Sequence, residues 1–146
     1  MGDDESVAHE LGPLIAKIRE QTKLLRSILS SMGDGLIVAD LNGKFLVFNP
    51  EAERIVGVGA TPTSPEQWPE RYGLFRPDGT TPFPTNEIPM VRAIRGEEAD
   101  NVEMFVRNAN VPDGVWISVT GRPLLDDEGV LRGGVVVLRD VTHRYR

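Results

Sequence analysis

The chain contains no cysteine. This absence excludes disulfides, thiolate nucleophiles and thiolate metal ligands, and it favours a reducing compartment, so we expect a cytoplasmic protein. Histidine is also scarce: His9 and His143 are the only copies, and they show no metal-ligand spacing. No apolar run reaches the roughly 20 residues that cross a bilayer, and no signal peptide opens the chain. We therefore expect no metal site and no membrane segment within these residues.

Positive charge and catalytic motifs are lacking as well. The net charge is −6 at pH 7, which disfavours nucleic acid as a partner because phosphate binding needs a positive patch. There is no phosphate-binding loop and no dinucleotide fingerprint. The acidic run Asp126–Asp127–Glu128 lies beside a glycine and is more typical of a solvated turn than of acid–base chemistry. We expect that this chain is not an enzyme.

A short heptad pattern opens the part of the chain that is informative. Leu11, Ile18, Leu25 and Met32 recur seven apart, and Leu14 and Ile28 occupy the companion position. The pattern predicts an amphipathic helix within residues 1–32. One interpretation is a coiled-coil seam between two copies of the chain, with Leu11, Leu14, Ile18, Leu25 and Ile28 in the dimer interface. The alternative is a helix that packs on its own domain.

Two groups of strands follow, separated by short helices. Alternation and turn signals predict strands over 36–41, 44–48, 102–108, 115–124 and 134–141, with Asn42-Gly43 as the hairpin turn between the first two. Helices are expected over 51–56, near 66–72 and over 86–95, the last one capped by Thr85. The stretch 59–84 is rich in proline and glycine, so most of it is expected to be loop. This order predicts an α+β fold with a five-stranded antiparallel sheet and helices on one face.

The last two strands indicate how the faces of the sheet are used. In strand 115–124, Ile117 and Val119 share the face that should meet the helices, and Trp116 is expected to be exposed on the other face. The run 135–138 is apolar at every position, which is typical of a strand covered on both sides. The N-terminal helix, or a partner's copy of it, is the expected cover for the outer face, and Trp116 is the expected contact.

The chain resembles the PAS family of sensory domains from Leu25 to Arg146. The resemblance rests on the order and spacing of several short stretches: Ser30 to Asp40, Asn42-Gly43-Lys44, Asn49-Pro50-Glu51-Ala52, Trp116 to Val119, Arg122-Pro123-Leu124 and Asp140-Val141-Thr142. It divides the chain into an N-terminal helix over 1–32, a PAS domain over 33–142 and the start of a linker over 143–146. The stretch 72–80 is similar to an insertion seen in PAS domains of bacterial sensor histidine kinases.

This resemblance implies a sensory module of a multidomain signalling protein. It implies a cleft for a small ligand, homodimerisation, and a relay in which Asp140 and Thr142 couple the sheet to a following helix and an output domain of the same chain. The output expected first is a histidine kinase of a two-component system. Two other readings stay open: a structural protein–protein interaction module without ligand, and a small enzyme on the same scaffold.

The residues also bear on what the cleft holds. Flavin-adduct photosensors of this family need a cysteine, which is absent, and neither histidine should reach the cleft as a haem ligand. Met90 or Met104 as a haem ligand is the weaker alternative to gap-filling core residues. We expect no cofactor and at most a small apolar ligand. The candidate pocket residues, which ordinary core packing also explains, are Ile37, Ala39, Phe48, Met90, Ile94, Met104, Val106, Ile117, Val119, Val136 and Leu138.

Overall fold

The computed structural model describes residues 16, 20–21 and 23–146, and it divides the chain into two compact units, Met1–Met32 and Gly33–Arg146. In the first unit residues 23–32 are helical, and Leu25 and Ile28 are exposed there. The other predicted interface residues of this helix, Leu11, Leu14 and Ile18, lie outside the described residues. No helix in the described part of the chain combines the length and the hydropathy that crossing a bilayer requires.

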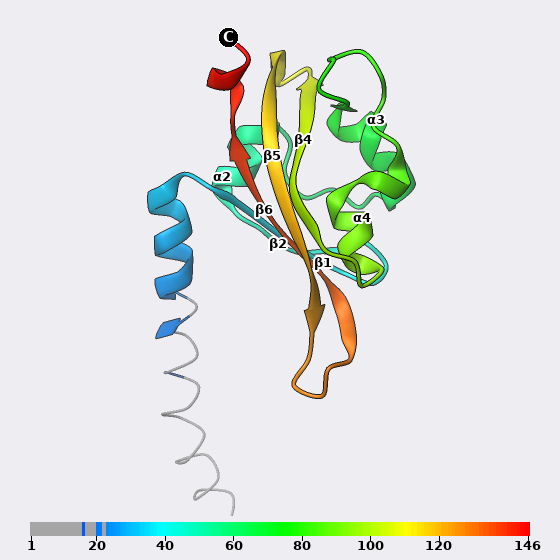
Figure 1. The fold of residues 1–146 in the computed structure, drawn as a ribbon. Coiled ribbons are helices and arrows are strands. Elements are labelled where there is room, and N and C mark those ends of the chain that lie inside the picture. Colours follow the sequence, from blue (N-terminus) through cyan, green and yellow to red (C-terminus); the bar gives the residue numbers. More distant parts are fainter. Residues whose placement is uncertain (1–15, 17–19, 22) are drawn as a thin grey trace, which may run out of the picture. The chain divides into compact units, whose positions relative to one another are not determined.

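The second unit is built on a six-stranded sheet, counted over the described residues, with strand order β2-β1-β6-β5-β4-β3 and antiparallel pairing throughout (Figure 1). The strands are β1 (Gly35–Asp40), β2 (Phe45–Phe48), β3 (Leu74–Phe75), β4 (Ala99–Asn108), β5 (Val111–Leu125) and β6 (Leu131–Asp140). The α+β fold is confirmed, but the expected count of five strands was wrong. The additional strand is β3, whose two residues pair with β4 and are too short to show an alternation pattern.

The turn between β1 and β2 forms where the sequence predicts it. Gly43 has φ +84°, in the left-handed region that glycine adopts without steric cost. The Asp40 carboxylate accepts hydrogen bonds from the backbone N–H groups of Asn42 and Lys44, each at 2.9 Å. A Cβ atom at Gly43 would lie 2.8 Å from Pro65, so the hairpin turn packs closely against the segment after residue 60.

Short helices connect the strands. They are α2 (Pro50–Val56), α3 (Trp68–Tyr72) and α4 (Pro89–Ile94), with 3₁₀ turns at Pro65–Gln67 (η1), Thr85–Glu87 (η2) and Thr142–Arg144 (η3). The Asn49 side chain caps α2 by accepting from Ala52 N at 2.9 Å. The expected helix over 86–95 with Thr85 as its cap was wrong in its start. Ile88 is extended because a residue before proline avoids the helical region, so α4 begins at Pro89.

The core lies between the helices and one face of the sheet, here called the inner face. Ile117 and Val119 of β5 and Val136 and Leu138 of β6 are each at most 4% exposed on this face. On the opposite, outer face Val135 and Val137 are half-buried. Strand β6 lies between β1 and β5, and its inner face is buried as expected. The expected cover of its outer face by the N-terminal helix or a partner's copy stays a prediction.

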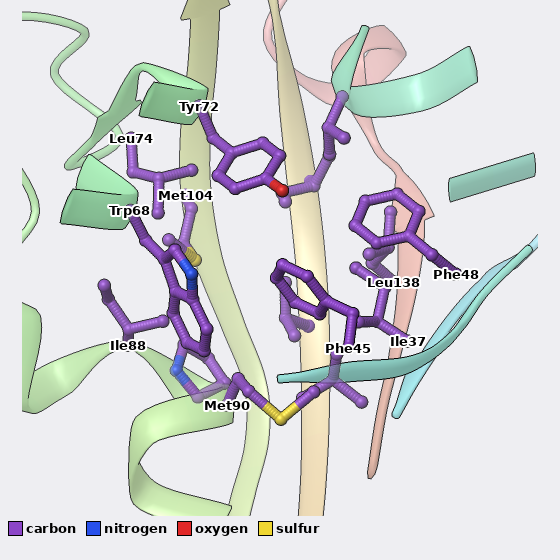
Figure 2. Close-up of a pocket in the computed structure, with 15 residues that line it drawn as sticks. Ile37, Phe45, Phe48, Trp68, Tyr72, Leu74, Ile88, Met90, Met104 and Leu138 are labelled. Atoms are coloured by element: carbon purple, nitrogen blue, oxygen red, sulfur yellow. The ribbon is translucent and has the colours of Figure 1, made fainter. Parts of the chain in front are cut away.

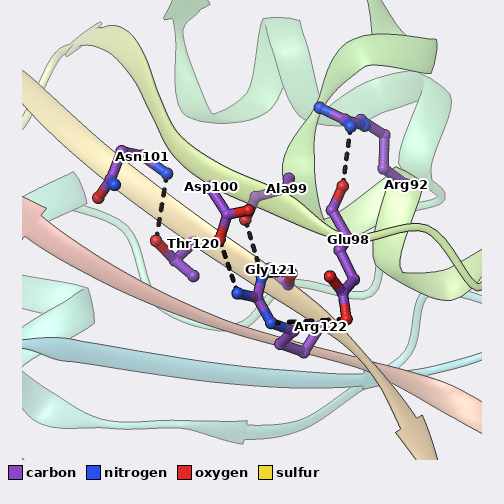
Figure 3. Close-up of polar contacts among 8 residues, drawn as sticks. All are labelled: Arg92, Glu98, Ala99, Asp100, Asn101, Thr120, Gly121 and Arg122. Carbon is purple, nitrogen blue, oxygen red and sulfur yellow. Dashed lines mark hydrogen bonds and ion pairs between the residues drawn. The ribbon is translucent and has the colours of Figure 1, made fainter.

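A cluster of polar contacts fixes the start of β4 against β5 (Figure 3). The Arg122 guanidinium donates to the Ala99 carbonyl at 3.2 Å and to the Asp100 carboxylate at 2.6 Å. Asn101 has φ +48° at a bulge in the β4–β5 pairing, and its N–H donates to Thr120 Oγ1 at 3.2 Å. These contacts replace ladder hydrogen bonds that the bulge interrupts.

Candidate functional site: an apolar cavity and the exit turn

A cavity of about 80 Å³ lies between the inner face of the sheet and the helical segments (Figure 2). It is bounded by residues of all six strands of the described sheet, by the end of α2, by α3 and by the start of α4. Its lining residues are Ile37, Phe45, Phe48, Val56, Trp68, Tyr72, Leu74, Ile88, Pro89, Met90, Met104, Ile117, Val119, Val136 and Leu138.

Most of the predicted pocket residues lie on this wall: strand alternation places the strand residues on the inner face, and Met90 comes from α4. These are Ile37, Phe48, Met90, Met104, Ile117, Val119, Val136 and Leu138. Three predicted residues lie elsewhere. Ala39 and Val106 are fully buried core residues outside the lining of the cavity, and Ile94 lines a surface groove with Leu41 and Val91. Ligand binding by this wall stays a prediction.

Sequence reasoning named Phe48 but missed the other aromatic residues of the wall, Phe45, Trp68 and Tyr72. Phe45 stacks on Trp68 with ring centroids 5.3 Å apart, and Phe48 stacks on Tyr72 at 6.3 Å. Trp68 and Tyr72 come from α3, which lies in the proline- and glycine-rich stretch expected to be mostly loop. Their spacing of i and i+4 places both rings on one helix face and was the available signal.

The wall is almost free of polar groups. The Tyr72 hydroxyl donates to the Gly59 carbonyl at 2.8 Å and lies 2.9 Å from Thr61 Oγ1, and burial raises its pKa above the ordinary tyrosine value. Trp68 is 3% exposed, and its indole Nε1 is the one buried side-chain nitrogen or oxygen of the described residues without a hydrogen-bond partner. No charged side chain lines the cavity.

The dimensions of the cavity decide between the cofactor alternatives. An apolar cavity that binds benzene measures about 150 Å³, so about 80 Å³ holds neither a haem nor an isoalloxazine ring. Met90 and Met104 lie on the wall as packing residues. His143 is exposed in η3, and His9 lies outside the described residues. The residues present therefore do not fit a large planar cofactor.

The predicted relay residues Asp140 and Thr142 lie in a compact turn at the end of β6, here called the exit turn (residues 140–142). The Asp140 carboxylate accepts from Thr142 N at 2.9 Å, and Thr142 Oγ1 accepts from Trp116 N at 3.1 Å. Val141 N donates to the Trp116 carbonyl at 2.8 Å. Both backbone polar groups of Trp116 in β5 are therefore hydrogen-bonded to the exit turn.

Trp116 is half-buried, so the expectation of an exposed side chain was wrong. Its ring stacks on Tyr145 at 4.7 Å and lies 4.6 Å from Phe105, and its Nε1 donates to the Pro77 carbonyl at 3.0 Å. Tyr145 comes from residues 143–146, which were expected to begin a linker and which fall within the second compact unit. A role of Trp116 in a dimer interface stays a prediction.

A buried carboxylate lies close to the exit turn. The Asp34 side chain is 4% exposed and accepts from the Arg139 guanidinium at 3.2 Å through both of its oxygens. Because Asp34 immediately precedes β1 and Arg139 lies at the end of β6, this ion pair joins the first strand to the last. The sequence offers no local signal for a pair so far apart along the chain.

Comparison with known proteins identifies the fold. A family model described as the PAS fold matches residues 29–146. A PAS domain from Colwellia psychrerythraea is similar at 18% identity and TM-score 0.57, over 84% of this chain and 98% of that one. A sensory box histidine kinase/response regulator from Burkholderia thailandensis is similar at 22% identity and TM-score 0.53, over 84% and 87%.

A third similar structure is the N-terminal domain of a diguanylate cyclase with PAS/PAC sensor from Marinobacter aquaeolei. Its identity is 15% and its TM-score 0.52, over 77% of this chain and 99% of that one. The search of curated proteins found no match. The chain belongs to the PAS-fold family, and the matched residues are a PAS sensory domain.

Proposed function

We propose that this domain is the sensory and homodimerisation module of a multidomain bacterial signalling protein, with a sensor histidine kinase as the first candidate output. In this proposal a change in the inner-face cavity moves β5 and β6, and the exit turn passes the movement to a following helix. The similar structures include domains of a histidine kinase and of a diguanylate cyclase, which supports a signalling output.

The observation that carries the proposal is that the cavity wall and the exit turn share adjacent residues. Ile117 lines the cavity on the inner face, and the preceding residue, Trp116, is hydrogen-bonded to Val141 and Thr142. Ile117 is also the ladder partner of Asp140. A displacement of Ile117 by a ligand therefore acts on the exit turn across a single peptide unit.

Dimerisation is supported by apolar surface on both units, each considered by itself. In helix 23–32, Leu24 is 62% exposed and Met32 58% exposed, next to the predicted interface residues Leu25 and Ile28. In the second unit Val135 and Val137 are half-buried on the outer face. Apolar side chains grouped in this way are typical of protein–protein interfaces.

Binding rather than catalysis is proposed because of the chemistry of the wall. Tyr72 is the one ionisable side chain among the described cavity-lining residues, its hydroxyl is already hydrogen-bonded, and its raised pKa keeps it protonated at neutral pH. A protonated phenol without a neighbouring base is a poor general acid–base group.

The test of the relay uses the parent protein with its output domain. Replacing Asp140 and Thr142 with Ala should uncouple the output from the input, while Asp127→Ala, an exposed carboxylate in the β5–β6 turn, should leave signalling unchanged. Unchanged signalling in the double variant would overturn the relay.

The test of the cavity is native mass spectrometry of the 146-residue chain together with an absorbance spectrum. A retained small molecule on a dimer supports the sensory module. The small cavity volume favours the second candidate, a ligand-free interaction module, and a dimer that neither retains a molecule nor binds small apolar probes would support that candidate instead.

A further inference from the structure

We infer that the cavity takes a small, neutral, mostly apolar molecule that carries one hydrogen-bond acceptor, and that this acceptor pairs with the indole N–H of Trp68. The inference rests on the proposed function as a small-molecule sensor and names the ligand chemistry of that site. It starts from Trp68 Nε1, the single buried side-chain nitrogen or oxygen of the described residues that no protein group satisfies.

The unpaired N–H is costly in the empty protein. Trp68 is 3% exposed, so water does not reach its Nε1, and no carbonyl, hydroxyl or carboxylate of the described residues accepts from it. A buried donor without a partner costs about 1–3 kcal/mol. Tryptophan that is buried usually finds a partner for this group, and Trp116 does so through the Pro77 carbonyl at 3.0 Å.

The neighbouring aromatic ring does not replace the missing acceptor. Phe45 stacks on Trp68 with an interplanar angle of 22°. The indole N–H lies in the plane of its own ring, so in this arrangement it runs along the Phe45 ring and does not point at its face. Figure 2 shows Trp68 at one side of the cavity, with its ring nitrogen on the edge that faces the lining residues Tyr72 and Met104.

The rest of the wall defines the other properties of the ligand. Among the described residues no charged side chain lines the cavity, so an ionic ligand would enter without a counter-ion, which is strongly unfavourable. The Tyr72 hydroxyl is engaged by Gly59 and Thr61 and offers no free donor. The accessible surface of the cavity is wholly apolar, and the Trp68 N–H is covered in the empty protein, so an acceptor reaches it only when the wall moves. These conditions select a ketone, ether, ester or similar neutral acceptor with a hydrocarbon body.

The size of the cavity limits that body to a few atoms unless the wall moves. Met90 and Met104 line it, and their unbranched, flexible side chains can rearrange around a ligand more easily than branched ones. Such a rearrangement would displace the strand that carries Met104 and the helix that carries Met90. Recognition by Trp68 and a change in the cavity wall are then parts of one binding event.

The experiment uses two ligands of the same shape, cyclopentanone and methylenecyclopentane, which differ in having an oxygen acceptor or a CH₂ group. They are titrated into the 146-residue chain, with the two indole N–H signals followed by ¹⁵N–¹H NMR. The ketone should move the Trp68 signal downfield, as a new hydrogen bond does. The Trp116 signal is the internal control, since its N–H is already paired with Pro77.

The matched variant is Trp68→Phe, which keeps an aromatic ring and removes the donor; it also assigns the two signals. The variant should bind the ketone about three- to tenfold more weakly, the range expected for loss of one hydrogen bond. Its affinity for the alkene should change by less than twofold. Each ligand is compared with itself in the two proteins, so the difference in hydration between ketone and alkene does not affect the ratio of affinities. Cyclopentanecarboxylate, the anionic analogue, should produce no shift at the concentration that saturates with ketone.

The outcomes separate this inference from the proposed function. If ketone and alkene both bind, and Trp68→Phe affects them equally with no shift of the Trp68 signal, the cavity is a ligand site but the assignment of the donor is wrong. A carboxylate that binds more tightly than the ketone would overturn the neutral class. If no ligand binds, the sensory cavity and this inference both fail, while an intact dimer would support the interaction module.

Discussion

The two faces of the sheet are made from the same strands but are stabilised differently. On the inner face Ile117, Val119, Val136 and Leu138 contact apolar neighbours around a cavity, and no hydrogen bond joins their side chains. On the outer face specific polar pairs join a strand to another strand or to a segment that borders the sheet. These pairs are Asp34–Arg139, Asn101–Thr120, Trp116–Thr142 and Tyr145–Glu103.

This difference indicates that the two faces have different mechanical properties. Apolar contacts are non-directional, so the inner wall can change shape without leaving a polar group unpaired. Hydrogen bonds and ion pairs require fixed partners, so the outer face holds the strand register and the exit turn. Under the proposed function, a ligand that altered the inner wall would move a sheet whose outer contacts resist sliding.

The largest expected effect tests the inner face. Leu138→Ala should lower the free energy of unfolding by about 3 kcal/mol, because Leu138 is 2% exposed and truncation removes packed methyl groups. The control is Leu46→Ala in β2, the same substitution at a side chain that is 56% exposed, with an expected change below about 0.5 kcal/mol. Urea unfolding measures both, and similar losses would contradict the contrast.

The next effect tests the outer ion pair, which is asymmetric in burial. Arg139→Gln should destabilise the domain by about 2 kcal/mol, because it leaves the buried Asp34 carboxylate without its cation. Asp34→Asn should cost less, about 1 kcal/mol, since the Arg139 side chain it leaves behind is 58% exposed and hydrated. Urea unfolding with the reverse order of losses would show that burial does not control this pair.

A smaller effect tests the exit turn. Thr142→Val removes the acceptor of the Trp116 N–H at nearly constant shape, with an expected loss of about 1 kcal/mol. Amide hydrogen exchange should accelerate at Trp116. The control is Thr120→Val, which removes an outer-face hydroxyl on β5, the strand of Trp116, and should leave the Trp116 amide protected. Equal exchange in both variants would mean that Thr142 does not hold the turn.

The smallest effect compares the two tyrosines, one for each face. Burial raises the pKa of Tyr72, whereas the hydrogen bond to Glu103 is the main cause that raises the pKa of Tyr145, so both should ionise above pH 10 in a titration followed at 295 nm. Each contribution to stability is fully present below pH 10 and is lost as the pH rises through the raised pKa of the folded state. Glu103→Gln should lower the pKa of Tyr145 and leave that of Tyr72 unchanged. A shift of both would indicate that the two rings share one environment.

Local patterns predicted the parts of the fold that depend on local chemistry. Asn42-Gly43 specifies its turn through backbone preference, and alternation in β5 and β6 placed Ile117, Val119, Val136 and Leu138 on the cavity wall. Inner-face position alone does not show which side chains border empty space, so Ala39 and Val106 were assigned to a wall that they do not reach.

Features that depend on distant partners were not predictable in this way. Strand β3 exists because its two residues meet β4, and the aromatic wall exists because α3 brings Trp68 against Phe45. Trp116 is half-buried because Phe105 and Tyr145 pack against its ring. The Asp34–Arg139 pair likewise requires the complete sheet, since neither residue shows a local preference for the other.

The pairing of β1 with β6 has a consequence for how the domain forms. Leu36 is the ladder partner of Val137, so the edge of β1 that pairs with β6 stays uncovered until the last strand has formed. Contacts this distant along the chain are expected to slow folding, because a long loop must close before they form. During synthesis β1 and β2 can form only an isolated hairpin, which is marginally stable at best in water. A nascent chain that ends before β6 would therefore expose its apolar strands, and ribosome-bound chains of increasing length should become protease-resistant only once residues up to Val141 have emerged.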